Sequence, residues 1–340
     1  MSMNKTILVT GGAGFIGSNF ISLLMNAYPQ CHVINLDALT YAGNLANTYR
    51  FSSSPKYQFF KERIENKDAL NHFFENTKID IIVNFAAESH VDRSVLSSEP
   101  FVVTNVLGTT CLLDFALKQK VSLFIQVSTD EVYGSLSQTG YFVEETPLAP
   151  NSPYSASKAA ADLIAKSYFH THGLPVIITR CSNNYGPYQH PEKLIPLTIT
   201  NAINDQKIPL YGTGENIRDW IYVDDHCEGI LHIMQKGKIG EVYNFGGHSE
   251  RSNVETISQI LTLLNKPKSL ITPVTDRLGH DFRYAIDTRK VSSLGWTPKH
   301  SFEQGLKKTV EWYLKEKSWW SSVKNGDYLA YYKQQYGGRL

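Results

Sequence analysis

Cysteine is scarce in this sequence, with four residues among 340 and no CxxC pair. Thiols this dispersed are typical of a reducing compartment and provide no zinc framework. No HExxH motif is present, and His170 and His172 lie two residues apart, on different faces of a predicted helix. The sequence therefore predicts free cysteines and no metal.

Long apolar runs and an excess of one charge are also missing. No window approaches 18 consecutive apolar residues, and the N-terminal MSMNKTILVTGG runs directly into glycines. We therefore expect neither a membrane span nor a signal peptide, and a cytoplasmic location. Lys and Arg total 33 against 32 Asp and Glu. This balance predicts no partner among nucleic acids or anionic membranes, so any recognition of phosphate must be local.

Short β-branched runs alternate with segments of helical length over the first half of the chain. Near-continuous apolar strands suit a parallel sheet that is covered on both faces. The predicted strands are Ile7–Thr10, Val33–Asp37, Ile81–Phe85, Phe124–Ser128 and Val176–Arg180, and the predicted helices are Ile16–Tyr28, Lys67–Asn76, Asn105–Gln119 and Ser152–His172. The repeated order indicates an α/β fold, a Rossmann-type doubly wound parallel sheet.

Turn clusters interrupt this pattern after about residue 182. A helix is expected over Leu194–Asn204, a strand over Glu241–Phe245 and a helix over Asn253–Leu264. We predict a Rossmann domain over residues 1–182, to which a later segment of about 220–247 returns. Residues 183–340 are then mainly a smaller C-terminal substrate-binding lobe and a tail. The tail is rich in Trp and Tyr, and we expect it to pack on the body.

A glycine-rich turn follows the first predicted strand. Gly11, Gly14 and Gly17 fit GxxGxxG, and Gly12 offers the alternative GxGxxG spacing. Such a turn lets the backbone approach a pyrophosphate at a helix N-terminus. Asp37 ends the next strand, twenty residues after Gly17, where a carboxylate accepts hydrogen bonds from ribose hydroxyls and repels a 2′-phosphate. The pattern favours NAD over NADP, although a structural glycine turn beside a capping Asp remains an alternative.

Tyr154 and Lys158 form a YxxxK pair, which shares one face of a helix. A phenol with a pKa near ~10 is a poor base at neutral pH. A neighbouring ammonium and a positive nicotinamide favour the phenolate and lower that pKa. Tyr154 can then take the proton from a sugar hydroxyl during oxidation.

Two adjacent carboxylates, Asp130 and Glu131, follow the strand that ends at Ser128. Strand ends at the carboxyl edge of such a sheet face the cofactor crevice. In a dry pocket the two groups titrate apart, so that one is a proton donor and the other a base. A solvated turn is the alternative for this motif alone.

Five motifs in one order resemble those of the extended short-chain dehydrogenase/reductases. These motifs are TGGAGFIG, NFAAESHVDRS, NVLGT, STDEVYG and YSASK, and the likeness continues through Arg180–Pro196, Pro209–His226, Tyr243–Gly247 and Asp276–Asp287. The combination is similar to the dTDP-glucose 4,6-dehydratases. STDEVYG discriminates, because related epimerases and GDP-mannose dehydratases carry another residue at the position of Asp130.

The resemblance implies a bound NAD, a nucleoside-diphosphate hexose substrate and a homodimer. It implies oxidation at C4, with Tyr154 as base and Thr129 holding the oxygen. Glu131 then removes the C5 hydrogen, Asp130 protonates the departing C6 hydroxyl, and the product is a 4-keto-6-deoxy sugar. Lys158 completes the catalytic set.

The family's binding residues carry over position by position. Cofactor contacts fall on Gly11, Gly14, Phe15, Ile16, Gly17, Asp37, Thr40, Ile64, Ala86, Ala87, Ser89, Asn105, Tyr154 and Lys158. Substrate contacts fall on Ser89, His90, Asn184, Glu192, Lys193, Leu194, Pro209, Tyr211, Arg218, Asn253, Arg277 and His280. Arg218 suits paired phosphate oxygens because its guanidinium is a fork of donors, with a surface salt bridge as the alternative.

Two positions depart from the family pattern. Arg63 precedes Ile64 where an Asp is usual, and Leu278 replaces a Pro in DRPGHD. Both departures border regions expected to bind nucleotide.

The rival functions are a 4,6-dehydratase acting on UDP-GlcNAc or UDP-glucose, a nucleotide-sugar 4-epimerase, and a non-catalytic NAD-binding sensor. The epimerase has no use for Asp130 and Glu131, and sensors typically lack an intact YxxxK pair.

Overall fold

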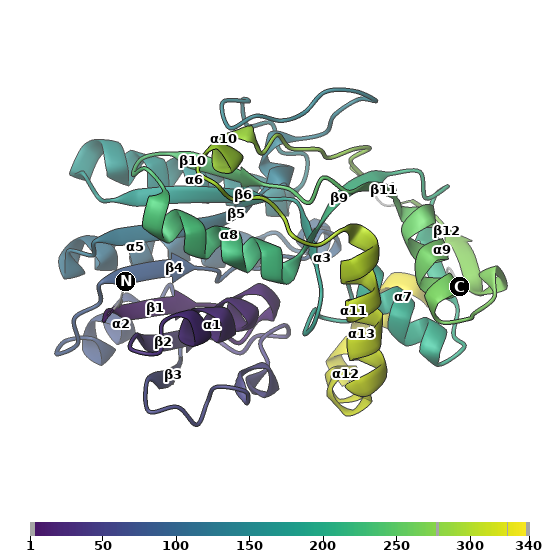
Figure 1. Ribbon diagram of the computed structural model, residues 1–340, viewed down its shortest axis with the longest axis horizontal. Helices are drawn as coiled ribbons and strands as arrows, with labels where there is room; N and C mark the ends of the chain where they lie inside the picture. The colour runs from purple at the N-terminus through teal and green to yellow at the C-terminus, as the bar shows by residue number, and fades with distance from the viewer. Residues whose placement is uncertain (1–3, 277–278, 325, 338–340) are drawn as a thin grey trace.

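The computed structural model describes residues 4–276, 279–324 and 326–337, and its centre is a seven-stranded parallel sheet (Figure 1). The strand order is β10-β6-β5-β4-β1-β2-β3. The strands are β1 (Thr6–Thr10), β2 (His32–Asp37), β3 (Tyr57–Lys61), β4 (Ile81–Asn84), β5 (Leu123–Thr129), β6 (Val176–Cys181) and β10 (Val242–Phe245). The predicted Rossmann-type fold is confirmed.

Helices cover both faces of this sheet. The helices α1 (Phe15–Ala27), α8 (Val223–Lys236) and α10 (Arg289–Ser293) share one hydrophobic core with alternate strand residues such as Ile7 and Val9. The helices α2 (Lys67–Phe73), α5 (Thr109–Gln119) and α6 (Pro153–His172) share a second core, which includes Leu8. Since successive side chains of a strand point to opposite faces, strands buried on both sides must be apolar throughout.

The order of the strands reverses beside β1. The chain runs outward from β1 to β2 and β3 on one side and through β4, β5 and β6 on the other. Loops at the carboxyl ends of β1 and β4 therefore separate, and such a crevice is the usual ligand site of a doubly wound sheet.

A smaller lobe lies beside the carboxyl edge of the sheet, at the right of Figure 1. Its strands are β7 (Asn183–Tyr185), β8 (Ile208–Tyr211), β9 (Ile217–Tyr222), β11 (Glu250–Ser252) and β12 (Ile271–Val274). Its helices are α7 (Leu194–Ile203), α9 (Asn253–Leu263), η4 (Lys268–Leu270), α11 (Phe302–Lys315), α12 (Lys317–Val323) and α13 (Gly326–Tyr336). The edge strand β10 of the large sheet comes from within this half of the chain. The predicted boundary near residue 182 stays a prediction.

The remaining short helices of this half of the chain are η1 (Leu45–Thr48), α3 (Val91–Leu96) and η3 (Asp130–Tyr133), together with α4 (Glu99–Phe101) and η2 (Val102–Gly108), which continue into α5. One helix and one strand of the Rossmann domain differ from the expectation. The helix expected from Asn105 begins at Glu99 and passes through the π-helical η2. The edge strand β3 was not predicted, because Tyr57–Lys61 is short and its side chains are mostly partly exposed.

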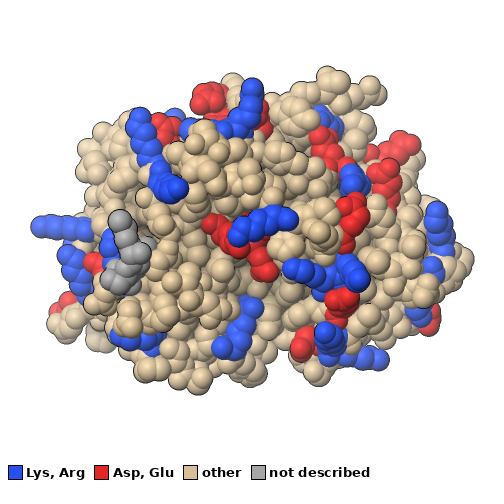
Figure 2. Space-filling model, in the orientation of Figure 1, with Lys and Arg blue, Asp and Glu red and all other residues tan. Residues whose placement is uncertain are grey.

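The continuous helix Glu99–Gln119 is long and apolar enough to cross a membrane. It contains no run of 18 consecutive apolar residues, because polar residues interrupt it. Half of the helix is buried in the fold, and the core helix of a soluble protein passes the same test. It is therefore weak evidence for a membrane span. Figure 2 shows positive and negative side chains interspersed over the visible face, in keeping with the balanced composition.

Candidate active site

One cavity of about 300 Å³ opens at the carboxyl edge of the large sheet. Its walls come from the loops after β1, β2, β4, β5 and β6 and from helix α6. Thirteen of the fourteen predicted cofactor residues line it, namely Gly11, Gly14, Phe15, Ile16, Gly17, Asp37, Thr40, Ile64, Ala86, Ala87, Ser89, Tyr154 and Lys158. Residues that are distant in the sequence thus surround a single space.

The glycine turn leaves no room for side chains. Gly11 has a φ of +68°, and a Cβ atom there would lie 2.7 Å from the backbone nitrogen of Ala86. A Cβ atom on Gly17 would lie 2.4 Å from the carbonyl oxygen of Gly11. Only glycine permits this packing of strand, turn and helix, which places the N-terminus of α1 at the cavity.

Asp37 fits the ribose end of a dinucleotide. It is 8% exposed, and its two carboxylate oxygens accept hydrogen bonds from the backbone nitrogens of Ala13 (2.9 Å) and Leu39 (2.8 Å). Burial raises the pKa of this carboxyl, and the two backbone donors oppose that rise. An anion fixed beside the turn suits two ribose hydroxyls and disfavours a 2′-phosphate. The residues present therefore fit NAD.

Asn105 is the predicted cofactor residue that does not line the cavity. Its side chain donates to the carbonyl oxygen of Glu88 (3.0 Å) and to Oγ of Ser157 (2.8 Å), and it accepts from the backbone nitrogen of Glu88 (2.9 Å). Glu88 itself lines the cavity. Asn105 therefore holds the loop after β4 against α6 from within the π-helical segment η2, where π-bulges often mark functional sites.

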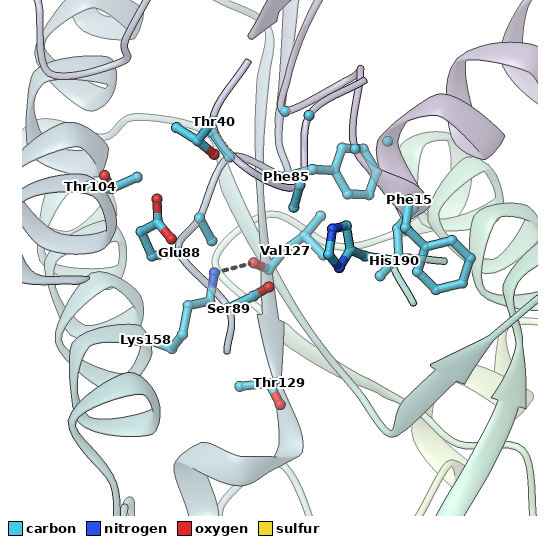
Figure 3. A pocket seen from close by; sticks show the side chains of 18 of the residues that line it. Phe15, Thr40, Phe85, Glu88, Ser89, Thr104, Val127, Thr129, Lys158 and His190 are labelled. Carbon is cyan, nitrogen blue, oxygen red and sulfur yellow. Dashed lines mark hydrogen bonds between the residues drawn. The ribbon is translucent and has the colours of Figure 1, made fainter. Parts of the chain in front are cut away.

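Tyr154 and Lys158 lie one turn apart on α6 and point into the cavity. Figure 3 shows Lys158 reaching from its helix to the strand that carries Val127 and Thr129, and its Nζ donates to the carbonyl oxygen of Val127 at 2.7 Å. Burial lowers the pKa of Lys158. Burial and then the charge of Glu131 hold the pKa of Tyr154 well above its usual range, and the hydroxyl of Thr129 opposes this.

The raised pKa of Tyr154 differs from the expectation that Lys158 lowers it. Desolvation of the phenolate outweighs the ammonium charge in the protein alone. A bound, oxidised nicotinamide would add positive charge that favours the phenolate.

The carboxylates Asp130 and Glu131 lie at the end of β5 in different environments. Asp130 is 1% exposed, its Oδ1 accepts from Oγ1 of Thr129 at 3.4 Å, and its Oδ2 has no hydrogen-bond partner among the described side chains. Burial first, and then the charge of Glu131, hold the pKa of Asp130 well above its usual range. Glu131 is partly exposed. Asp130 is thus suited to donate a proton and Glu131 to accept one.

Four predicted substrate residues line the same cavity: Ser89, Asn184, Glu192 and Lys193. Nζ of Lys193 donates to the carbonyl oxygen of Ser89 at 2.8 Å, which joins the lobe to the loop after β4. Glu192 is buried and accepts from Nε of Arg93 at 3.3 Å. Asn184 contacts Nδ1 of His226 at 2.9 Å.

The other predicted substrate residues do not line this cavity. They are His90, Leu194, Pro209, Tyr211, Arg218, Asn253 and His280; Arg277 and the neighbouring Leu278 lie outside the described residues. Arg218 is buried and donates to the carbonyl oxygens of Ile217 (2.7 Å), Asp281 (3.0 Å) and Phe282 (3.4 Å). It is therefore not a surface salt bridge.

The C-terminal helix α13 lies over some of the predicted substrate residues that do not line the cavity. Nε2 of Gln335 donates to Oη of Tyr211 at 2.7 Å, and Oη of Tyr211 contacts Oη of Tyr336 at 3.4 Å. The rings of His90 and Tyr331 are 5.3 Å apart. The aromatic tail thus packs on the body, as expected, and it does so beside residues predicted to bind substrate.

Several lining residues were not among the predictions. They include Gly43, Arg63, Glu88, Cys181, Gln189 and His190. Each lies at the end of a sheet strand, in the loop that follows one, or next to a predicted residue, so the rule that the carboxyl ends of strands form the site would have found most of them. No cluster of three or more potential metal ligands occurs among the described residues.

Comparison with known proteins matches most of this chain to one family. The family model described as GDP-mannose 4,6 dehydratase matches residues 8–309. A dTDP-glucose 4,6-dehydratase of Xanthomonas campestris is 48% identical, over 95% of this chain and 97% of that protein.

Two solved structures share both fold and sequence with the chain. The dTDP-glucose 4,6-dehydratase of Bacillus anthracis, in complex with NAD, has a TM-score of 0.89 and 54% identity, covering 94% of this chain and 100% of that one. DesIV of Streptomyces venezuelae, a dTDP-glucose 4,6-dehydratase with NAD and TYD bound, has a TM-score of 0.91 and 48% identity with the same coverage. The chain therefore belongs to the family of dTDP-glucose 4,6-dehydratases.

Proposed function

We propose that the protein is an NAD-dependent hydro-lyase that converts dTDP-glucose to dTDP-4-keto-6-deoxyglucose. One observation carries this proposal: a buried Asp130, whose pKa is held well above its usual range, and a partly exposed Glu131 share a cavity with the Tyr154–Lys158 pair and a dinucleotide cradle. A redox-neutral elimination needs an acid, a second base and a redox site together. Relatives named for this reaction support the substrate.

The roles of the side chains follow from their environments. Tyr154 accepts the proton of the C4 hydroxyl, and Thr129, at the end of β5, holds that oxygen. Oxidation of C4 acidifies the hydrogen on C5, which Glu131 removes. Asp130 donates its proton to the C6 oxygen, which leaves as water. NAD, when bound, would accept the hydride from C4 and return it to C6, while the proton held by Glu131 returns to C5, so that water is the only species lost and no net oxidant is consumed.

We assign substrate binding to the residues around and beside the cavity. Ser89, Asn184, Glu192 and Lys193 border the space next to Tyr154 and are the candidates for the sugar end. The residues in contact with the C-terminal helix, such as Tyr211 and His90, are candidates for the nucleotide end, together with Arg218. Because none of these side chains distinguishes thymine from uracil by itself, a substrate panel is required.

A homodimer formed through α6 and the helix beside it is part of the proposal. Apolar side chains on these neighbouring helices are exposed, with Val102 at 53%, Leu107 at 52% and Leu163 at 58%. Contiguous exposed apolar surface is typical of an interface. The four free cysteines, three of them buried, support a reducing, cytoplasmic location.

The first experiment is product mass spectrometry. The purified protein is incubated, without added NAD, with dTDP-glucose, UDP-glucose or UDP-GlcNAc in separate reactions. We expect the loss of one water from dTDP-glucose only. Loss of water from a UDP-sugar would reassign the substrate. An unchanged mass in every reaction, even after NAD is added, would contradict the dehydratase and favour the epimerase or the sensor.

A further inference from the structure

Three buried ionisable side chains lie along one face of α6. Tyr154, Lys158 and Asp162 are spaced by four residues, so they follow one another on the side that packs against β5 and β6. Their exposed fractions are 8%, 4% and 1%. The proposed mechanism uses the first two and gives Asp162 no role, although a carboxylate is rarely buried this deeply unless it is paired.

Arg180 is the hydrogen-bonded partner of Asp162. Its Nε donates to Oδ2 of Asp162 at 3.0 Å, and the two side chains are 6% and 1% exposed. Arg180 lies on β6 directly opposite Ser128 of β5, and its guanidinium lies 4.7 Å from the centre of the Tyr133 ring. The side chain of Ser128 also lowers the pKa of Asp162 through a hydrogen bond. The ion pair and this hydrogen bond therefore fix the side chain under α6.

The buried ammonium of Lys158 is stabilised by a nearby negative charge, and its hydrogen-bond acceptor does not provide one. Its Nζ donates to the carbonyl oxygen of Val127, which is a neutral acceptor. Burial lowers the pKa of Lys158, and the charge that opposes this most strongly is the carboxylate of Asp162. Arg180 in turn opposes the rise that burial imposes on the pKa of Asp162. Charges therefore alternate along the row from Arg180 to Asp162 to Lys158.

Other charged groups near this face do not replace Asp162. Burial raises the pKa of Cys181 on β6 to about 12, which keeps it a neutral thiol, and the pKa of Asp130 is held well above its usual range. On the helices that also pack against α6, Asp114 bonds to Tyr168 and Arg93 bonds to Glu192. The charge of Glu131 acts on Tyr154, Asp130 and Tyr284, whereas the charges that act on Lys158 are those of Asp162 and Cys181.

We propose that Asp162 is a positioning residue of the oxidation step: its carboxylate, held by Arg180, keeps the buried Lys158 an ammonium beside Tyr154. This inference rests on the proposed role of Tyr154 as the base. A neutral Lys158 would no longer stabilise the phenolate, so loss of the Asp162 charge would weaken C4 oxidation without touching the substrate.

The test compares two variants that break the same hydrogen bond. Asp162→Asn with Arg180→Met removes both charges, so no buried charge is left unpaired. Arg180→Lys breaks the same hydrogen bond but keeps both charges, so the carboxylate of Asp162 stays paired. Ionisation of Lys158 is followed by NMR in the NAD-bound protein labelled with ¹³C-lysine, and its signal is assigned by its loss in Lys158→Arg. Asp162→Asn alone carries the same test if the double variant does not fold.

The expected result is an acid dissociation constant of Lys158 at least about tenfold larger in the double variant, because an opposite charge nearby shifts a pKa by about 1 to 3. It should not increase in Arg180→Lys, which keeps the carboxylate of Asp162 ionised. The alkaline decline of C4 oxidation should move to lower pH in parallel. An unchanged titration of Lys158, or the same change in both variants, would overturn the inference and leave Asp162 a structural partner of Arg180.

The titration uses no sugar, so its outcome is independent of the substrate. If the native protein dehydrates none of the nucleotide sugars, the proposed function fails while the titration still decides the role of Asp162.

Discussion

At the scale of single residues, burial sets the protonation of the site. Asp130 and Glu131 are adjacent in the chain, yet only Asp130 is fully enclosed. Desolvation penalises its charged form, and the neighbouring carboxylate adds to that penalty. Two identical functional groups thereby acquire opposite roles in a proton transfer, which is how one site can hold an acid and a base at the same pH.

Asp130→Asn should separate the two halves of the reaction. The amide cannot donate a proton to the leaving hydroxyl, but Tyr154 and Lys158 remain, so C4 oxidation should proceed and water loss should slow by about 10²-fold or more. Enzyme-bound NADH should then accumulate and be visible by its absorbance. Tyr154→Phe is the matched comparison and should give no such signal. Dehydration at the native rate in Asp130→Asn would remove Asp130 as the acid.

The raised pKa of Asp130 also predicts the pH dependence of dehydration. A free Asp ionises near ~3.9, whereas Asp130 stays protonated above that range. The acid form should therefore persist toward neutral pH, and product formation should decline only as the pH rises through the raised pKa. Rates are measured at saturating substrate across the pH range. A decline already complete between pH ~4 and ~5 would show an ordinary carboxyl group instead.

At the scale of elements, helices position the cavity through close packing. The π-helical η2 carries Asn105, which clamps the loop of Glu88, and ends at Gly108. A Cβ atom on Gly108 would lie 2.6 Å from Cγ1 of Ile64, a residue that lines the cavity. Any residue with a side chain at position 108 would therefore prevent the helix from packing this closely against the wall of the cavity.

Gly108→Ala should weaken NAD binding. The added methyl group must displace Ile64, and overpacking of this kind costs about 1 to 3 kcal/mol, which corresponds to roughly a 5- to 150-fold loss of affinity if the displacement falls on the cofactor wall. Calorimetric titration of the NAD-free protein with NAD measures the effect. Gly326→Ala, where a Cβ atom has no neighbour within 4 Å, is the control. Equal affinities in the two variants would contradict the role of this packing.

At the scale of the whole molecule, the site is assembled from two halves of the chain. The Rossmann domain provides the Tyr154–Lys158 pair and the carboxylates of Asp130 and Glu131. The lobe provides Asn184, Glu192 and Lys193. The exposed apolar residues on η2 and α6 face away from this cavity's walls, since none of Val102, Leu107 and Leu163 lines it. Dimerisation through them would leave the active site open.

Leu163→Glu should convert a dimer to a monomer. A charged side chain at the centre of an apolar interface is desolvated without a partner, which opposes association. Light scattering after size-exclusion chromatography gives the mass directly. Leu314→Glu is the control, because Leu314 is 53% exposed and lies on α11, away from these helices. This variant should leave the mass unchanged. A native protein that is already monomeric at micromolar concentration would refute the proposed dimer.

Local rules determined much of the fold before any tertiary information. Apolar strands, helical periods and the glycine turn are set by neighbouring residues, so the sheet, its helices and the motif residues could be predicted. The same holds for the YxxxK spacing and for the adjacent carboxylates. The edge strand β3 escaped prediction because it is short and its apolar pattern is weak, with a single buried residue at the edge of the sheet.

The sequence by itself determined the family, and it predicted the cofactor cradle and the proposed catalytic set, since each corresponds to a contiguous motif. Only the tertiary structure decided that Asn105 holds a loop instead of lining the cavity, that Arg218 bonds to backbone carbonyls, and that Asp130 is the enclosed carboxyl. These outcomes depend on burial and on contacts between distant segments. Desolvation and long-range charge are properties of the folded environment, so the spacing of residues along the sequence does not determine them.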